Sequence, residues 1–449
     1  MNDNNNEVYK VTNEHITPAQ LLVLSFLGII LAGSLLLCTP WSVQNGQINF
    51  LTALFTATSA VCVTGLIVVD TATHWTHFGQ VVIIILIQIG GLGVMSFATF
   101  LALLFGWKIH FRQRLIMQQA MNQSSVGGIV KIFRYLLIIT FSIEAIAALI
   151  LTIHWTPLLG FKKALWFGIF HSVSAFNNAG FDLFGNFRSL TGFTTDFTVN
   201  MVITSLIIMG GLGFVVLYEI FHFKKKDTLS LHARVVLITT AILIIAGTII
   251  LFLSEYNHAL KDLPLAGKLL ASYFQSVSPR TAGFNTIDLN SLFLSSQLII
   301  ILLMFIGGSP GSTAGGIKTS TFALLWIAII SQLRGKKDNE IFQRQIPNSD
   351  MFQALTITLL SGFTLITMTF LLALIHQADL TQIIFEVASA LGTVGLSLGL
   401  TTQLTPCEQL IIIITMFLGR VGPLTLGFAL AYKRKQPEIH YPKGKIMIG

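Results

Sequence analysis

Four short stretches of this chain share a pattern of residues whose backbone groups could bind a cation. In the first, second and fourth stretches a Phe is followed four residues later by Ser, and that Ser six residues later by Gly; the third stretch is one residue shorter before its Gly. The four sets are Phe55, Ser59 and Gly65; Phe170, Ser174 and Gly180; Phe274, Ser278 and Gly283; and Phe385, Ser389 and Gly395. Carbonyls that all face one axis need backbone angles that residues with a Cβ adopt poorly, so glycine is expected there.

The fourth stretch contains Thr393-Val394-Gly395, the core of the filter sequence of potassium channels, in which backbone carbonyls replace the water shell of the ion. Four copies in one chain are the number needed to surround one pore. Ordinary glycine turns between apolar helices are the alternative, which the matched flanks disfavour. The predicted filter residues are Val63, Thr64 and Gly65; Asn178, Ala179 and Gly180; Thr281, Ala282 and Gly283; and Thr393, Val394 and Gly395.

The composition indicates an integral membrane protein. The 449 residues are 53% hydrophobic and only 10% charged, whereas a soluble chain carries about 25% charged residues. The polar start of the chain does not resemble a cleavable signal peptide. Cys38, Cys62 and Cys407 form neither a CxxC motif nor a Cys/His cluster, so no metal site or disulfide framework is predicted.

Apolar segments that could cross the hydrocarbon core, about 30 Å thick, alternate with shorter apolar segments. The predicted spans are 19–38, 78–104, 132–155, 197–222, 232–254, 296–330, 351–375 and 408–432. Pieces such as 47–60 and 162–176 precede the glycine stretches and are too short to span, so we interpret them as re-entrant pore helices. The predicted fold is an all-α polytopic membrane protein of four pseudo-repeats around one pore, each a membrane helix, a pore helix, a filter loop and a membrane helix.

The same pattern divides the chain into segments. We expect a cytoplasmic N-terminal segment over 1–18, pore repeats over 19–107, 131–223, 231–334 and 350–433, an intramembrane loop over 307–318, and a cytoplasmic tail over 434–449. Most of the 27 Lys and Arg residues lie in the loops between repeats and in the tail. An excess of Lys and Arg marks the cytoplasmic side, so both termini are expected inside and the filters are expected to open outward.

Several motifs resemble those of the Trk/Ktr/HKT superfamily of cation transporters, and most of all the bacterial Ktr membrane subunits of the KtrB/KtrD type. They are Phe176–Phe181, Pro279–Phe284, Ile306–Lys318 and Gly419–Thr425. The resemblance implies potassium transport across the bacterial plasma membrane, sodium as an activator, a homodimer, and a cytosolic nucleotide-binding ring of the KtrA/KtrC type. It implies no covalent cofactor. In this superfamily a Ser at the first filter glycine accompanies sodium permeability, and Gly65 at that position favours potassium.

A gate is predicted where the span 296–330 is interrupted by Gly, Ser, Pro and Thr, through which a helix cannot continue. The gate residues are Gly307, Gly308, Ser309, Gly311, Ser312, Thr313, Gly315, Gly316, Lys318 and Arg420. A simple kink is the alternative for the loop. The resemblance places Arg420 beneath the filter as a barrier to cations; an ion pair or a clamp on carbonyls is its alternative. Glu144 also lies inside a span, with no partner that the sequence identifies.

Asp70, Asp182 and Asp288 follow three of the filters closely. They could concentrate cations at the outer mouth, or they could cap nearby helix termini.

We interpret the chain as a channel-like pore subunit. A coupled secondary carrier would have broken helices too, but commonly in two inverted repeats, and a less selective sodium and potassium pathway also stays open. An enzyme is not expected, since no intramembrane cluster of His, Asp, Ser or metal ligands appears. The basic loops contain no nucleotide-binding motif, so regulation should come from a separate subunit. Membrane lipid is an expected partner, nucleic acid is not, and the tail is expected to join the homodimer.

Overall fold

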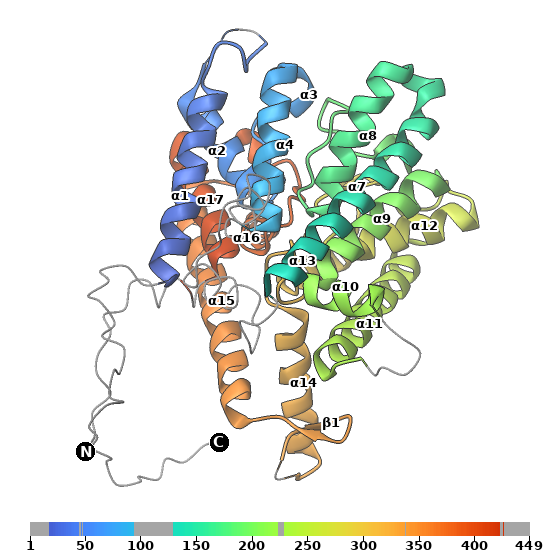
Figure 1. Ribbon diagram of the computed structural model, residues 1–449, viewed down its shortest axis with the longest axis vertical. Helices are drawn as coiled ribbons and strands as arrows, with labels where there is room; N and C mark the ends of the chain where they lie inside the picture. Colours follow the sequence, from blue (N-terminus) through green and yellow to red (C-terminus); the bar gives the residue numbers. More distant parts are fainter. Residues whose placement is uncertain are drawn as a thin grey trace, which may run out of the picture.

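The protein is a bundle of helices that confirms the predicted all-α fold of four repeats (Figure 1). The computed structural model describes residues 18–44, 46, 48–93, 129–222, 229–336, 338–422 and 425. The predicted tail 434–449, most of the segment 1–18 and the loop after the first repeat lie outside the described residues.

Each repeat contains a long first helix, a shorter pore helix and a second helix. The first helices are α1 (Pro18–Leu37), α7 (Ile129–Leu159), α11 (Leu231–Glu255) and α15 (Asn348–Ile375). The pore helices are α2 (Phe50–Val61), α8 (Phe161–Phe176), α12 (Leu265–Val277) and α16 (Leu380–Gly392). The second helices are α4 (His77–Leu92), α9 (Phe197–Leu212), α13 (Leu294–Phe305) and α17 (Pro406–Val421).

Smaller elements join these helices. They are α3 (Thr71–His74), α10 (Phe214–Phe221), α14 (Thr319–Leu333), three single 3₁₀ turns, and an antiparallel hairpin of β1 (Glu340–Ile341) and β2 (Arg344–Gln345). The hairpin lies between α14 and α15, at the lower end of Figure 1.

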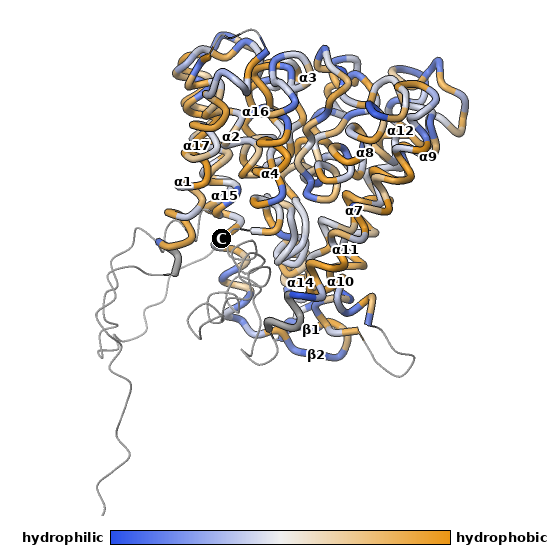
Figure 2. The backbone as a smooth tube through the Cα atoms, turned by 45° about the horizontal axis from the view of Figure 1, so that its top comes forward, coloured by the Kyte–Doolittle hydropathy of each residue, from blue (hydrophilic) through white to orange (hydrophobic). Residues whose placement is uncertain are grey.

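The first helices have the length and apolar composition needed to cross a membrane on their own. They are the four single helices of the described residues that meet both criteria. They also carry exposed apolar side chains, among them Leu35, Ile153, Leu253 and Phe363. Figure 2 shows hydrophobic residues along these helices and more hydrophilic residues in the hairpin. Such surfaces are stable against lipid, so the protein spans the membrane several times.

Three of the four second helices end at a glycine. Gly93, Gly213 and Gly422 cap α4, α9 and α17 with φ of 82°, 92° and 87°, a conformation that side chains with a Cβ rarely adopt. The chain bends by 106° between α9 and α10. The predicted span 197–222 is therefore two helices that meet at a sharp break. The repeated Gly-Gly-Leu-Gly of residues 90–93 and 210–213 was the sequence signal for these breaks.

Glycine also lets three of the four second helices approach the pore helix of their own repeat. A Cβ on Gly90, Gly210 or Gly419 would lie closer than 3.0 Å to a backbone carbonyl oxygen at the end of that pore helix. The three oxygens belong to Val61, Phe176 and Leu391, each four residues before a filter glycine. These three second helices thus support the pore-helix end from which the chain enters the filter loop of the same repeat.

Candidate functional site

The four filter loops share one backbone conformation. The first residue of each predicted triplet has a positive φ: 57° at Val63, 58° at Asn178, 79° at Thr281 and 50° at Thr393. Each triplet glycine has one as well: 88° at Gly65, 69° at Gly180, 77° at Gly283 and 95° at Gly395. Left-handed angles cost a non-glycine residue roughly 1–2 kcal/mol, so the four non-glycine residues at equivalent places indicate a conformation that the surrounding structure imposes.

The four triplets close into a ring. A Cβ on any of the four glycines would lie closer than 3.0 Å to the carbonyl oxygen of the middle triplet residue in the next repeat. Gly65 faces Ala179, Gly180 faces Ala282, Gly283 faces Val394, and Gly395 faces Thr64. The order runs from repeat one to four and back to one, so the structure brings the twelve predicted filter residues together around one axis.

The serine of each repeated stretch holds its own filter loop. Ser59 and Ser389 accept hydrogen bonds from the N–H groups of Gly65 and Gly395, both at 3.0 Å. In the other two repeats the serine donates instead to the carbonyl of the residue after the glycine, from Ser174 to Phe181 at 2.8 Å and from Ser278 to Phe284. The sequence revealed the repeated serine but not this contact.

We expect Ser389→Ala to loosen the fourth filter loop, because it leaves the Gly395 N–H without its acceptor. This donor is partly buried, and leaving it unsatisfied costs up to about 1–3 kcal/mol. Thermal unfolding should shift to lower temperature, and competition of sodium with rubidium uptake in vesicles should increase. Ser349→Ala is the matched control, since Ser349 is exposed at the start of α15 and far from the filter in the chain. Equal selectivity of the two variants would contradict the bracing role.

Other pore-helix side chains hold the segments that follow the filters. His171 Nε2 accepts a hydrogen bond from the Leu183 N–H at 3.3 Å. Glu386 accepts hydrogen bonds from Ser397 at 2.7 Å and from Thr401. His171 and Glu386 both lie three residues before the filter serine of their repeat. In these two repeats the side chain at this position therefore accepts hydrogen bonds from the segment that follows the filter.

A cavity of about 320 Å³ lies on one side of the ring and is lined by all four filter glycines, Asp182 and Asp288. We call this the mouth side. Asp70 is not among the lining residues; it caps α3 by accepting from the N–H groups of Ala72 and Thr73 at 2.9 and 3.1 Å. Asp288 caps a 3₁₀ turn and also faces the cavity. Burial, together with repulsion from Asp70, raises the pKa of Asp182 to about 7.

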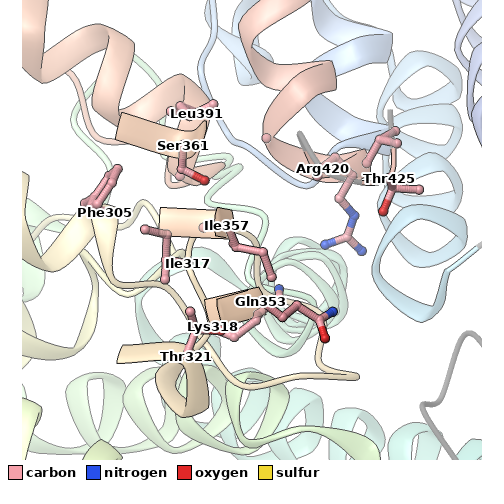
Figure 3. Close-up of a pocket in the computed structure, with 15 residues that line it drawn as sticks. Phe305, Ile317, Lys318, Thr321, Gln353, Ile357, Ser361, Leu391, Arg420 and Thr425 are labelled. Atoms are coloured by element: carbon pink, nitrogen blue, oxygen red, sulfur yellow. The ribbon is translucent and has the colours of Figure 1, made fainter. Parts of the chain in front are cut away.

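A second cavity, of about 290 Å³, is lined by residues around the opposite end of the fourth filter loop. Leu391 and Gly392 contribute from the end of α16, Lys318 from the predicted gate loop, and Gln353 from α15. Figure 3 shows Arg420 reaching into this region from α17, with Lys318 and Gln353 across from it.

The predicted gate loop 307–318 connects α13 to α14 and is bonded to the break between α9 and α10. The Ser309 N–H donates to the Gly211 carbonyl at 2.9 Å, and the Phe214 N–H donates to the Gly311 carbonyl at 2.9 Å. A Cβ on Gly315 would lie closer than 3.0 Å to Thr393 Oγ1, so this part of the loop lies directly against the fourth filter stretch. A break of this kind is permitted at membrane depth because the loop is enclosed in protein.

Arg420 joins the gate loop to the end of α4. Its guanidinium donates to the carbonyls of Thr313 and Gly90, and to that of Gly91 at 3.5 Å. Lys318 Nζ donates to the Ala314 carbonyl at 2.7 Å. The carbonyl clamp that the sequence left as an alternative is the arrangement found, and it also leaves a positive charge below the filter.

Glu144 gains the partner that the sequence did not identify. Its Oε1 accepts from Asn177 Nδ2 at 3.1 Å, and the same Nδ2 donates to Gln88 Oε1 at 2.9 Å. Asn177 immediately precedes the filter residue Asn178. This buried network therefore fixes the second filter loop to α4 and α7.

Comparison with known proteins gives consistent matches over nearly the full chain. The family model TrkH, described as cation transport protein, matches residues 12–440. The chain is 44% identical to Ktr system potassium uptake protein B of Bacillus subtilis, with 96% of this chain and 97% of that protein covered. It is 39% identical to potassium/sodium uptake protein NtpJ of Enterococcus hirae, with 98% of this chain and 99% of that protein covered. The fold also resembles the crystal structure of the potassium transporter TrkH from Vibrio parahaemolyticus, with a TM-score of 0.75 at 19% sequence identity. The match covers 94% of this chain and 87% of that one, and at this identity it shows a shared fold.

Proposed function

The chain belongs to the TrkH family of cation transport proteins, and from that premise we propose that it takes up potassium across the plasma membrane as the channel-like pore subunit of a Ktr system. The observation that carries this proposal is the closed ring of four filter triplets. A fourfold set of backbone carbonyls can replace the water shell of a potassium ion without any side-chain chemistry. The members of this family are ion transporters and not enzymes.

The two cavities suggest a direction for the path. Cations would enter on the mouth side, where Asp182 and Asp288 line the cavity, pass the ring, and meet the gate loop and Arg420 on the other side. The distribution of Lys and Arg supports an outward-facing mouth with both termini in the cytoplasm. The gate loop would obstruct the path at rest and move when a partner acts.

Relatives that are named as parts of Ktr systems support further components in the assembly. We propose a homodimer gated by a cytosolic nucleotide-binding ring of the KtrA/KtrC type, with sodium as an activator. The hairpin β1–β2 would offer that ring a surface.

A less selective pathway for sodium and potassium is the second candidate. It is favoured by the name of the Enterococcus relative and by the three filter loops that lack Thr-Val-Gly. Rubidium uptake into vesicles, with and without competing sodium, separates the two candidates. Strong inhibition of rubidium uptake by an equal concentration of sodium would support the less selective pathway. Single-channel recording would separate either one from a coupled carrier.

We expect uptake to rise with external pH around neutrality, because the pKa of Asp182 is raised to about 7. Below that pH the carboxyl is protonated and neutral. Above it the carboxylate is charged and attracts cations to the mouth. Initial rubidium uptake at low ion concentration should increase between pH 6 and pH 8 in wild type, and Asp182→Asn should flatten this profile. An equally steep profile in the variant would assign the pH dependence to another group.

A further inference from the structure

A pocket between the first and second repeats combines positive charge with an apolar border and has no part in the path described above. It has a volume of about 440 Å³ and is lined by Gln44, Ala72, His77, Gln80, Lys162, Lys163, Trp166, Phe167 and Leu183. Six of its nine lining residues lie in α4 and α8 near their starts, and Leu183 follows the mouth-cavity residue Asp182, which places the pocket on the mouth side. The volume falls in the range of ligand pockets, about 300–1,000 Å³.

The two lysines of this pocket are not neutralised by the protein. Among the described residues no ion pair involves Lys162 or Lys163, and Lys163 instead lies over the Phe167 ring at 5.3 Å. Lys268 of the third repeat gives the contrast: its ammonium donates to the Tyr256 carbonyl at 2.6 Å and lies 3.8 Å from the Tyr256 ring centroid. The charge of the pair 162–163 is therefore available to an anion.

Nearby carboxylates do not supply that anion. Asp70 lies two residues before Ala72, and Asp182 lies directly before Leu183. Both accept hydrogen bonds from backbone N–H groups, Asp70 from Phe187 at 3.0 Å and Asp182 from Phe184 at 3.0 Å. The start of α8 adds positive potential, because Gly160 provides no side-chain cap for its free N–H groups.

The walls of the pocket are fixed rather than adaptable. Trp166 Nε1 donates to Gln80 Oε1 at 2.8 Å, which joins α8 to α4. The Trp166 ring also meets the His77 ring edge-on, with centroids 5.6 Å apart. A rigid site of this kind loses little entropy when a ligand binds.

Apolar side chains border the pocket where its two helices face outward. Phe161, Leu165 and Ile169 are exposed at intervals of four residues on α8. Phe78, Val81 and Ile85 are exposed along one face of α4. Tryptophan is enriched at membrane interfaces, and along α8 Trp166 follows Lys162 by about one turn and precedes Ile169 by about one turn. This order of charge, Trp and apolar surface is the order of groups along a phospholipid.

We propose that this pocket binds the phosphate group of an anionic phospholipid in the mouth-side leaflet. Lys162 and Lys163 would pair with the phosphate, His77 and the start of α8 would add hydrogen-bond donors, and the acyl chains would lie along the exposed faces of α4 and α8. Because the site bridges two repeats, the bound lipid would hold them together. The site is separate from the proposed filter and gate, so its test does not depend on transport.

The test compares the full chain with Lys162→Gln/Lys163→Gln, with Lys261→Gln as the matched control. Lys261 is an exposed lysine between α11 and α12 of the third repeat, without an ion pair among the described residues. Native mass spectrometry would compare the number of phosphatidylglycerol molecules that stay bound to each variant with the number of phosphatidylcholine molecules. Two surface lysines should account for about a thirtyfold loss in binding of the anionic lipid. Wild type and Lys261→Gln should retain it equally, and so should Lys162→Arg/Lys163→Arg.

A second measurement distinguishes the source of the phosphate. The midpoint of thermal unfolding in nanodiscs should rise with phosphatidylglycerol in wild type and not in the double Gln variant. Retention of the lipid by the double Gln variant at the wild-type level would overturn the proposal. A rise in midpoint caused by inorganic phosphate alone, in phosphatidylcholine nanodiscs, would also overturn it, because the ligand would then be a free anion.

Discussion

Gly65→Ser is expected to lower the preference for potassium over sodium by about tenfold or more, which needs only about 1.4 kcal/mol. Gly65 has a φ of 88°, and a Cβ there would lie closer than 3.0 Å to the Ala179 carbonyl oxygen. This oxygen belongs to the backbone and cannot rotate away as a side chain could, so the serine must displace the first or the second filter loop. Because the ring is closed, a displacement at one contact alters the spacing of the carbonyls around the axis.

The measurement is rubidium uptake into vesicles at several sodium concentrations, with protein amount and oligomer size matched to wild type. Gly362→Ser is the control, because a Cβ at that position of α15 meets no atom within 4 Å. Gly283→Ser should behave like Gly65→Ser, since its φ is 77° and it faces the Val394 carbonyl in the same way. If folded Gly65→Ser protein keeps wild-type selectivity, Gly65 does not belong to the filter.

Opening the gate is expected to raise uptake on the order of tenfold, a change that requires about 1.4 kcal/mol in the barrier. Deleting Gly308–Gly315 removes the loop that lies against the fourth filter stretch. Arg420→Ala leaves the loop in place but removes both the charge and the clamp on the Thr313 and Gly90 carbonyls. Either change should also reduce the dependence of transport on a regulatory subunit, while selectivity stays the property of the filter.

Arg420→Lys separates the two roles of Arg420. Lysine keeps the charge but lacks the planar fork that can hold two carbonyls at once. If repulsion limits uptake, the Lys variant should transport like wild type; if the clamp does, it should transport like Arg420→Ala. A loop deletion that folds, assembles and transports no faster than wild type would make 307–318 a structural break and not a gate.

The sequence by itself determined the membrane class and the four-repeat fold. Span length follows from the thickness of the hydrocarbon core, and that constraint acts on local composition. The filter stretches were visible for a similar reason, since a carbonyl site needs glycine at a fixed distance from its pore helix. Both features depend on residues near one another in the chain, and so they can be recognised without a structure.

Only the tertiary structure decided how those stretches meet. The contact of Gly395 with the Thr64 carbonyl joins the last repeat to the first, and Arg420 reaches Gly90 across 330 residues of the chain. The sequence showed the glycines of residues 210–213 but not that α9 would end there with a bend of 106°. Glycine is used alike for a turn, a left-handed angle or a close approach, and the choice depends on which backbone the fold places beside it.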